Sequence, residues 1–129
     1  MVQVENEYGS YEQEKCDFRY TEHLRDEFVR LLGNETLLFT TDGHFELFYK
    51  CGRIPGVYPT IDFGIMDSVD SLMKTFALYR KYQPNGPLVN SEYYSGWIDY
   101  WEQEHQMRSI VNFTETLDAM LSMNASVNM

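Results

Sequence analysis

Two short segments of the sequence place carboxylates where an apolar strand pattern ends. In the first, Glu5, Asn6 and Glu7 follow one another at the end of an alternating stretch at 2–6. In the second, Glu92 closes the segment "PLVNSE". A pair of carboxyl groups can hydrolyse a glycosidic bond when one is protonated to assist the leaving oxygen and the other attacks the anomeric carbon. Glu7 and Glu92 are therefore candidate catalytic residues, provided that the fold brings them together.

The apolar residues around these acids alternate between strand and helix periodicity. Strands are predicted at 2–6, 36–41, 58–64 and 87–92, with a further strand beginning in "ASVNM" at the end of the chain. Helices are predicted at 17–32, 68–82 and 107–122, and a loop or short helix at 44–56. This order is typical of βαβ units with a parallel sheet, whose right-handed crossovers bring all carboxyl ends of the strands to one face. The acids at those ends are Glu7, Asp42, Asp62 and Glu92.

Two α/β architectures fit this order. In a (β/α)8 TIM barrel the face at the carboxyl ends of the strands carries the active site, but such a barrel needs about 250 residues. With 129 residues and five strand candidates, the chain is predicted to be a partial barrel, a single fragment covering 1–129. The alternative is a small flavodoxin-like, doubly wound sheet, although its usual glycine-rich phosphate loop is absent from the sequence.

Composition narrows the possible partners and cofactors. The net charge of −10 argues against nucleic acid, whose phosphates attract basic surfaces. No apolar run approaches the roughly 20 residues of a membrane-spanning helix. His23, His44 and His105 do not cluster in the sequence, so we expect no metal and no cofactor. Ten Tyr, eight Phe and two Trp suit a core, and they also suit stacking against a sugar ring.

The cysteines and the glycosylation signals bear on the compartment. Cys16 and Cys51 form one disulfide, or else they are two free buried thiols. Asn34, Asn112 and Asn124 each begin an N-glycosylation triplet. Together these features favour a secreted or lysosomal protein. No signal peptide opens the chain, so we expect a segment upstream of it.

Four segments closely resemble the family 35 glycoside hydrolases: "VQVENEYGSY", "LLFTTDG", "TIDFG" and "GPLVNSEYYSGWIDYW". The resemblance runs in order through essentially all of the chain. It implies a (β/α)8 barrel that removes terminal β-D-galactose by a retaining double displacement, without a cofactor. Glu7 matches the general acid/base at the end of the fourth strand of that barrel, and Glu92 matches the nucleophile at the end of the seventh.

The same resemblance implies further site residues and partners. Asn6 matches the residue that holds the 2-hydroxyl of the sugar, and Tyr94 and Trp97 match the wall of the galactose pocket. Cys16 and Cys51 match a pair of bonded cysteines. The substrate would be a β-galactoside, and a full-length enzyme of this kind could form a homo-oligomer.

The resemblance also marks what the chain lacks. The resemblance implies that the chain starts at the fourth strand of the family's barrel and stops within the eighth, so we expect it to lack the galactose contacts of the first three strands. We therefore expect the isolated chain to be unstable and inactive, as a fragment of a longer enzyme would be. The alternative is a non-catalytic carbohydrate-binding or interaction protein.

We expect the remaining acids to have structural roles. Asp42 and Asp62 are expected to cap turns or the helices that follow, and Glu5 to form a salt bridge or another structural contact. A nucleophile must be ionised at the working pH, so Glu92 is expected to have hydrogen-bond donors near its carboxylate.

Overall fold

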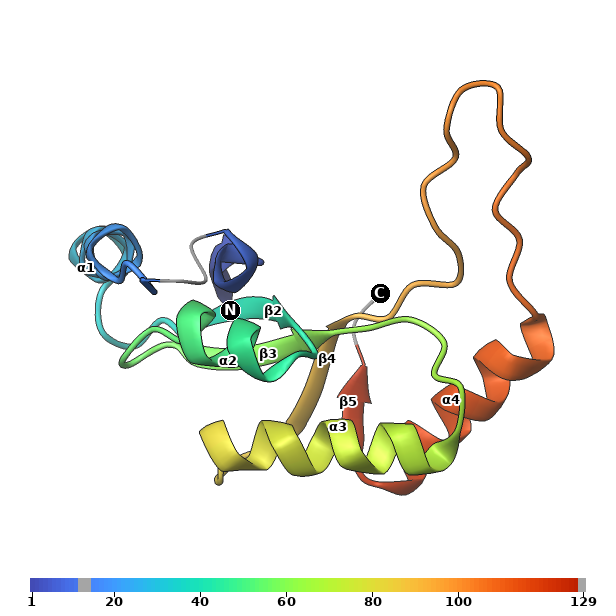
Figure 1. Ribbon diagram of the computed structural model, residues 1–129. Coiled ribbons are helices and arrows are strands. Elements are labelled where there is room, and N and C mark those ends of the chain that lie inside the picture. Colours follow the sequence, from blue (N-terminus) through green and yellow to red (C-terminus); the bar gives the residue numbers. More distant parts are fainter. Residues whose placement is uncertain (12–14, 128–129) are drawn as a thin grey trace.

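The protein is built on a five-stranded, wholly parallel sheet. The computed structural model describes residues 1–11 and 15–127, and Figure 1 shows the arrangement of the elements. The strands are β1 (Val2–Asn6), β2 (Leu38–Gly43), β3 (Tyr58–Asp62), β4 (Leu88–Glu92) and β5 (Ala125–Val127). These bounds confirm the predicted strands. The last two residues of "ASVNM" lie outside the described residues.

Four α-helices alternate with the strands. They are α1 (Arg19–Leu32), α2 (Glu46–Gly52), α3 (Val69–Tyr82) and α4 (Ile110–Ser122), with a short 3-10 turn, η1 (Tyr8–Ser10), after β1. Ser68 and Ser109 cap α3 and α4 because their side chains accept hydrogen bonds from backbone N–H groups of the first turn. Among the described residues, no helix is both long and apolar enough to cross a membrane.

The order of the strands excludes one of the two predicted architectures. In space the strands follow their order in the chain, β1-β2-β3-β4-β5, and each pairs in parallel with the next. A flavodoxin-like sheet has the order 2-1-3-4-5, so that alternative is wrong. When the strand order never reverses, right-handed crossovers leave all connecting helices on the same face of the sheet. Because all five strands are parallel, their carboxyl ends lie along one edge of the sheet.

Two apolar clusters hold the helices against the sheet. The larger lies between β3, β4, β5 and the helices α3 and α4, and it includes the fully buried Ile61, Leu72 and Met120. The smaller lies between β1, β2 and α1, around Val4 and Leu38. Both draw on the residues whose periodicity predicted the elements, because burial of those side chains is what stabilises each helix on the sheet.

A layer of hydroxyl groups joins four strands just below their carboxyl ends. Thr41 Oγ1 lies 2.8 Å from Ser91 Oγ and accepts a hydrogen bond from Gln3 Nε2 at 3.1 Å. Thr60 Oγ1 lies 2.6 Å from Ser91 Oγ and also donates to the Thr40 carbonyl oxygen at 2.8 Å. Buried polar groups are tolerated when they are bonded to one another. This layer therefore fixes the lateral alignment of β1 to β4.

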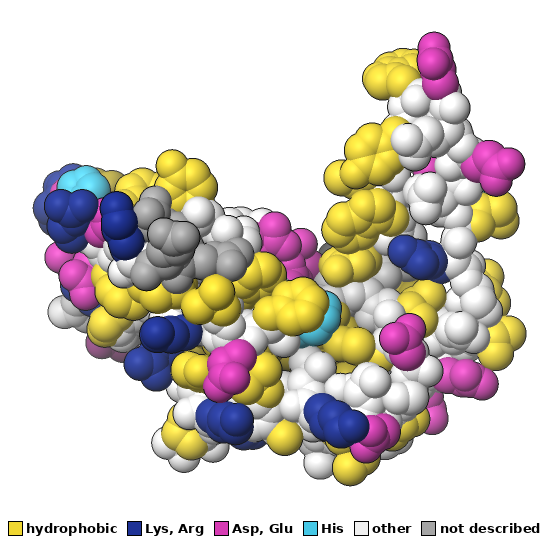
Figure 2. Space-filling model, viewed as in Figure 1, with side chains coloured by type: hydrophobic (Ala, Val, Ile, Leu, Met, Phe, Trp, Pro, Cys, Tyr) yellow, Lys and Arg dark blue, Asp and Glu magenta, His cyan; other side chains and the backbone are white. Residues whose placement is uncertain are grey.

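The segment between β4 and α4, residues 93–109, projects away from the sheet (Figure 1). At its base, the Tyr93 hydroxyl donates a hydrogen bond to the Phe113 carbonyl oxygen at 2.6 Å. Near its far end, Asp99 accepts hydrogen bonds from the Gln106 N–H and from the His105 ring, and both lower the pKa of Asp99. Figure 2 shows many hydrophobic side chains along this projecting loop.

Replacing the core residue Leu72 by alanine should lower the free energy of unfolding by about 2–5 kcal/mol, because the change leaves a cavity between α3 and the sheet. Leu72 is 1% exposed. Lys74→Ala in the same helix is the matched control. It removes only a solvent-exposed ion pair with Asp70 and should change stability by about 0.5 kcal/mol or less. Denaturant unfolding measures the free energy of unfolding of both variants. An equal decrease in the two variants would contradict the placement of Leu72 in the core.

Candidate active site

Three carboxyl groups meet at the carboxyl ends of the strands. One oxygen each of Glu7, Asp62 and Glu92 lies within 4.8 Å of the other two. Asp62 ends β3 and is the register partner of Glu92, the last residue of β4. Two of the acids that the sequence singled out, Glu7 and Glu92, are therefore brought together, and Asp62 joins them.

Glu7 reaches this cluster from β1, although β2 lies between β1 and β3. The residue of β2 that pairs with Asp62 is Gly43, which has no side chain to fill the gap. A Cβ atom at Gly43 would lie 2.6 Å from the Phe48 ring and 3.3 Å from an oxygen of Asp62. Glycine at this position thus keeps open the space across which Glu7 and Asp62 meet.

Glu7 has a backbone conformation that non-glycine residues rarely adopt. Its φ of 55° and ψ of 25° lie in the left-handed region, which costs about 1–3 kcal/mol unless neighbouring contacts hold it. Its N–H donates to the Thr41 carbonyl oxygen at 2.7 Å. Its carbonyl oxygen accepts from the Ser10 N–H at 3.0 Å and from Ser10 Oγ at 2.8 Å. These bonds hold the turn that directs the Glu7 side chain toward the rim.

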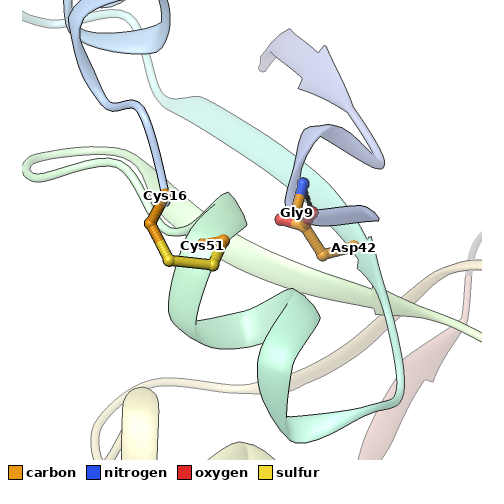
Figure 3. The surroundings of a disulfide bond; sticks show 4 residues. All are labelled: Gly9, Cys16, Asp42 and Cys51. Carbon is orange, nitrogen blue, oxygen red and sulfur yellow. Dashed lines mark hydrogen bonds between the residues drawn. A yellow bond between two sulfur atoms is a disulfide. The ribbon is translucent and has the colours of Figure 1, made fainter. Parts of the chain in front are cut away.

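Asp42 and a disulfide anchor the segment that follows Glu7, as Figure 3 shows. Asp42 Oδ1 accepts a hydrogen bond from the Gly9 N–H at 2.9 Å. A Cβ atom on Gly52 would lie 2.0 Å from that carboxyl group, so α2 packs directly on it. Cys16 and Cys51 are bonded, which confirms the disulfide and excludes the two free thiols. Both contacts tie the chain after β1 to the unit formed by β2 and α2.

Burial and mutual repulsion govern the protonation of the cluster. Asp62 is 4% exposed. Desolvation, a hydrogen bond to the Glu7 side chain and the nearby carboxylates raise its pKa well above that of an ordinary aspartate, to about 8. Desolvation and the charge of Glu7 also raise the pKa of Glu92. The expectation of donors around Glu92 is wrong for the described residues, where no N–H or O–H group donates to its carboxylate.

The cluster opens into a cleft of about 750 Å³ lined by Glu7, Glu92 and residues 93–98. Figure 2 shows the hollow between the projecting loop and the rest of the molecule. Two of the lining residues, Tyr94 and Trp97, form an aromatic pair with ring centroids 5.6 Å apart. The Tyr94 ring packs directly on Gly64, where an added Cβ atom would lie 2.6 Å from the ring. Both predicted wall residues therefore face the space next to Glu7 and Glu92.

Asn6 lies to one side of this cleft. Together with Glu5 and Glu7 it lines a neighbouring depression of about 470 Å³, and its Oδ1 accepts a hydrogen bond from Gln3 Nε2 at 2.8 Å. The carboxylate of Glu5 accepts from the Tyr20 hydroxyl at 3.2 Å and from the Asn6 N–H. Glu5 is thus a structural residue in hydrogen bonds, and none of the described ion pairs includes it.

Asp62 was expected among the acids at the strand ends, but sequence reasoning missed its contact with Glu7. It was expected to cap a turn, but its side chain bonds to Glu7. Asp42, by contrast, does hold a turn, since it binds the N–H of Gly9 in η1. The register separates the two aspartates: Asp62 pairs with Gly43, and Asp42 pairs with Ile61. Because side chains alternate along a strand, Asp42 and Asp62 belong to opposite faces of the sheet.

No histidine belongs to the carboxyl cluster, although three carboxylates at this spacing are ligands of the type that hard cations prefer. Acidic groups often lie together without an ion. The raised pKa of Asp62 offers another way to relieve their repulsion, because it allows the cluster to hold a proton. The arrangement by itself therefore identifies no metal centre.

Comparison with known proteins identifies the family. Residues 1–129 match the model of the glycosyl hydrolases family 35. The chain belongs to this family. A mouse β-galactosidase-1-like protein is 54% identical over 128 residues, and a bovine β-galactosidase is 48% identical. The human β-galactosidase is 44% identical. Each match covers 99% of the chain but only 18–19% of the relative, so the chain spans about a fifth of the length of these family 35 proteins.

The three asparagines predicted to carry glycans are all exposed in this family 35 chain. Asn34 follows α1, Asn112 lies in the first turn of α4, and Asn124 lies between α4 and β5. Their exposure is compatible with modification, which stays a prediction.

The family 35 fold should be more stable in acid than at neutral or alkaline pH. Burial raises the pKa of Asp42 to about 7, above the value of about 3.9 in an unfolded chain. The folded state therefore binds more protons between about pH 4 and 7, and stability falls as the pH rises through that window. The raised pKa of Asp62 acts in the same direction.

We expect the melting temperature of the wild type to be higher at pH 5 than at pH 8, and the Asp42→Asn variant to show a smaller difference. Asparagine cannot ionise, but its oxygen can still accept the Gly9 N–H. Scanning fluorimetry at both pH values measures this. An unchanged pH dependence in the variant would contradict the burial argument.

Proposed function

We propose that the chain carries the catalytic carboxylates of a retaining β-galactosidase, with Glu7 as general acid/base and Glu92 as nucleophile. The observation that supports this most strongly is the distance between them. Oxygens of the two residues lie within 4.8 Å, close to the separation of about 5–5.5 Å in retaining enzymes and short of the 6.5–9.5 Å of inverting ones. The relatives named β-galactosidase, at 44–48% identity, support galactose as the sugar.

The surroundings of the two residues support this division of roles. Glu92 ends a strand whose register partners fix it, as an attacking group needs in order to meet the anomeric carbon. Glu7 follows a strand on a turn and is exposed at the cleft, where it can reach a leaving oxygen and later a water molecule. The charge of Glu92 disappears when it forms the glycosyl ester, and Glu7 can then act as base.

Three further residues would contact the substrate. Tyr94 and Trp97 offer an aromatic wall beside the acids, against which the apolar face of a pyranose ring can pack. Asn6 precedes the general acid and would hold the 2-hydroxyl. Its amide is bonded to Gln3 rather than aimed into the cleft, so this role requires a rotation of the Asn6 side chain when the sugar binds.

The chain as a whole would form strands four to eight of a catalytic (β/α)8 barrel. The uninterrupted parallel order of β1 to β5 and the coverage of about a fifth of each relative support this placement. A lysosomal or secreted setting is supported by the disulfide, by the exposed glycosylation triplets and by buried acids that stabilise the fold at low pH.

Removal of the nucleophile should abolish hydrolysis of an aryl β-galactoside by the complete natural protein that carries this chain. In Glu92→Ala we expect kcat to fall by several orders of magnitude, as it does when a covalent nucleophile is lost. Azide should restore turnover by attacking from the vacated side, and the product should then be the α-galactosyl azide. In Glu7→Ala azide should give the β-galactosyl azide, because Glu92 still forms the ester. Product configuration is read by NMR.

Glu5→Gln is the matched control, since Glu5 is a neighbouring carboxylate that does not line the cleft. It should retain most of its activity. Undiminished hydrolysis by Glu92→Ala, or azide products of the same configuration from both alanine variants, would contradict the assignment. Binding of galactosides without any turnover by the wild type would favour a carbohydrate-binding protein instead.

A further inference from the structure

The proposed reaction uses two carboxyl groups, yet the cluster contains three. One oxygen of Asp62 lies within 4.8 Å of an oxygen of each catalytic candidate. Asp62 is 4% exposed, and its side chain bonds to Glu7. A residue so buried offers little surface to a sugar. Two carboxyl groups that share a hydrogen bond must also hold at least one proton between them, because an ionised carboxylate only accepts.

The charge balance of the reaction indicates which state of Asp62 the site can accommodate. Before the sugar is transferred, Glu92 is ionised and Glu7 holds the proton that it will give to the leaving oxygen. In the glycosyl ester, Glu92 is neutral and Glu7 is ionised. If Asp62 keeps its own proton in both states, the cluster carries one negative charge throughout. An ionised Asp62 would raise that charge to two, with the three groups within 4.8 Å of one another and Asp62 itself buried.

Resting on the function proposed above, we propose that Asp62 is a positioning residue that stays protonated through the catalytic cycle. Its O–H donates a hydrogen bond to the carboxyl group of Glu7 and directs the other Glu7 oxygen into the cleft. No bond to the sugar forms or breaks at Asp62, and its proton is not transferred. The aspartate acts on the substrate only through Glu7.

The groups around Asp62 favour the neutral form from every side. Three carboxylates raise the pKa of Asp62: Glu7 from the turn after β1, Asp42 from β2 and Glu92 from β4. Asp62 in turn raises the pKa of two nearby tyrosines, Tyr49 from α2 and Tyr94 from the projecting loop. The His44 ring bonds to the backbone of Asp62 rather than to its carboxyl group. No described lysine or arginine is among the groups that shift the pKa of Asp62, so its charge would have no partner.

Two substitutions separate a neutral donor from an ionised carboxylate. Asp62→Asn keeps the size of the side chain and an N–H donor but cannot ionise. Asp62→Ala removes the donor. In the complete natural protein we expect Asp62→Asn to keep kcat for an aryl β-galactoside within about 5-fold of the wild type. We expect Asp62→Ala to lose up to about 100-fold, as small misplacements of a catalytic group do.

The pH profile of kcat/KM gives a second readout that a purely structural role would not affect. Its alkaline limb reports loss of the catalytic proton from the free enzyme. In Asp62→Ala the limb should move to higher pH by about one unit, because the ionised form of Glu7 loses a donor. In Asp62→Asn it should stay near that of the wild type. Thr60→Val is the control, since Thr60 lies two residues before Asp62 on the same face of β3. It removes a buried hydrogen bond, and should lower the melting temperature without moving the limb.

Three results would overturn the proposal. An ionised Asp62 would make both variants shift the limb to lower pH, since both would remove a negative charge beside Glu7. A merely structural Asp62 would leave the limb in place while both variants lose activity equally. If Asp62→Ala fails to fold, infrared difference spectra between Asp62→Asn and the wild type at pH 6 still show whether Asp62 is protonated. We expect the variant to lose the band of one protonated carboxyl group, and its persistence would refute the proposal.

These outcomes differ from a failure of the proposed function. The azide products of Glu92→Ala and Glu7→Ala depend on the two glutamates and not on the state of Asp62. If those products have the expected configurations while Asp62→Asn is as damaged as Asp62→Ala, only the role of Asp62 is wrong. If the azide products fail, the catalytic assignment itself is wrong.

Discussion

The site depends on one constraint, the parallel pairing of β1 to β4 in chain order. Because every strand runs in the same direction, residues that are 85 positions apart in the sequence, Glu7 and Glu92, finish at the same rim. The hydroxyl layer beneath them fixes the alignment of the four strands. Gly43 then leaves the end of β2 open, so that Glu7 can meet Asp62 across it.

This convergence has an electrostatic cost that shapes the rest of the site. Carboxyl groups held within 4.8 Å repel one another when they are ionised, and burial strengthens the effect. Burial is the largest cause of the raised pKa values of Asp42, Asp62 and Glu92, and the nearby charge of Glu7 raises each of them further. The protons that these acids retain because of their raised pKa values have two consequences. The fold gains stability as the pH falls, and one acid of the cluster can stay neutral as a hydrogen-bond donor. An acidic working environment suits both.

The sequence predicted the elements of the fold well and the contacts of individual acids poorly. The periodicity at 68–82 and the alternation at 2–6 depend on local burial, which a single segment expresses, and both elements formed as expected. The opposite orientations of Asp42 and Asp62 depend on register, a property of two paired strands that neither strand carries alone. The left-handed backbone of Glu7 likewise depends on a hydrogen bond to Thr41, which lies 34 residues further along the chain.

Covalent trapping measures the central claim most directly. A 2-deoxy-2-fluoro-β-galactosyl fluoride reacts with a retaining galactosidase to leave a stable ester on the attacking carboxylate. After digestion of the inactivated natural protein, mass spectrometry should find the fluorogalactosyl group on the peptide that contains Glu92, and Glu92→Gln should not be labelled. A label on Glu7, on Asp62, or on a residue outside the cluster would contradict the proposal that Glu92 attacks the sugar, that Glu7 transfers the proton and that Asp62 keeps its own.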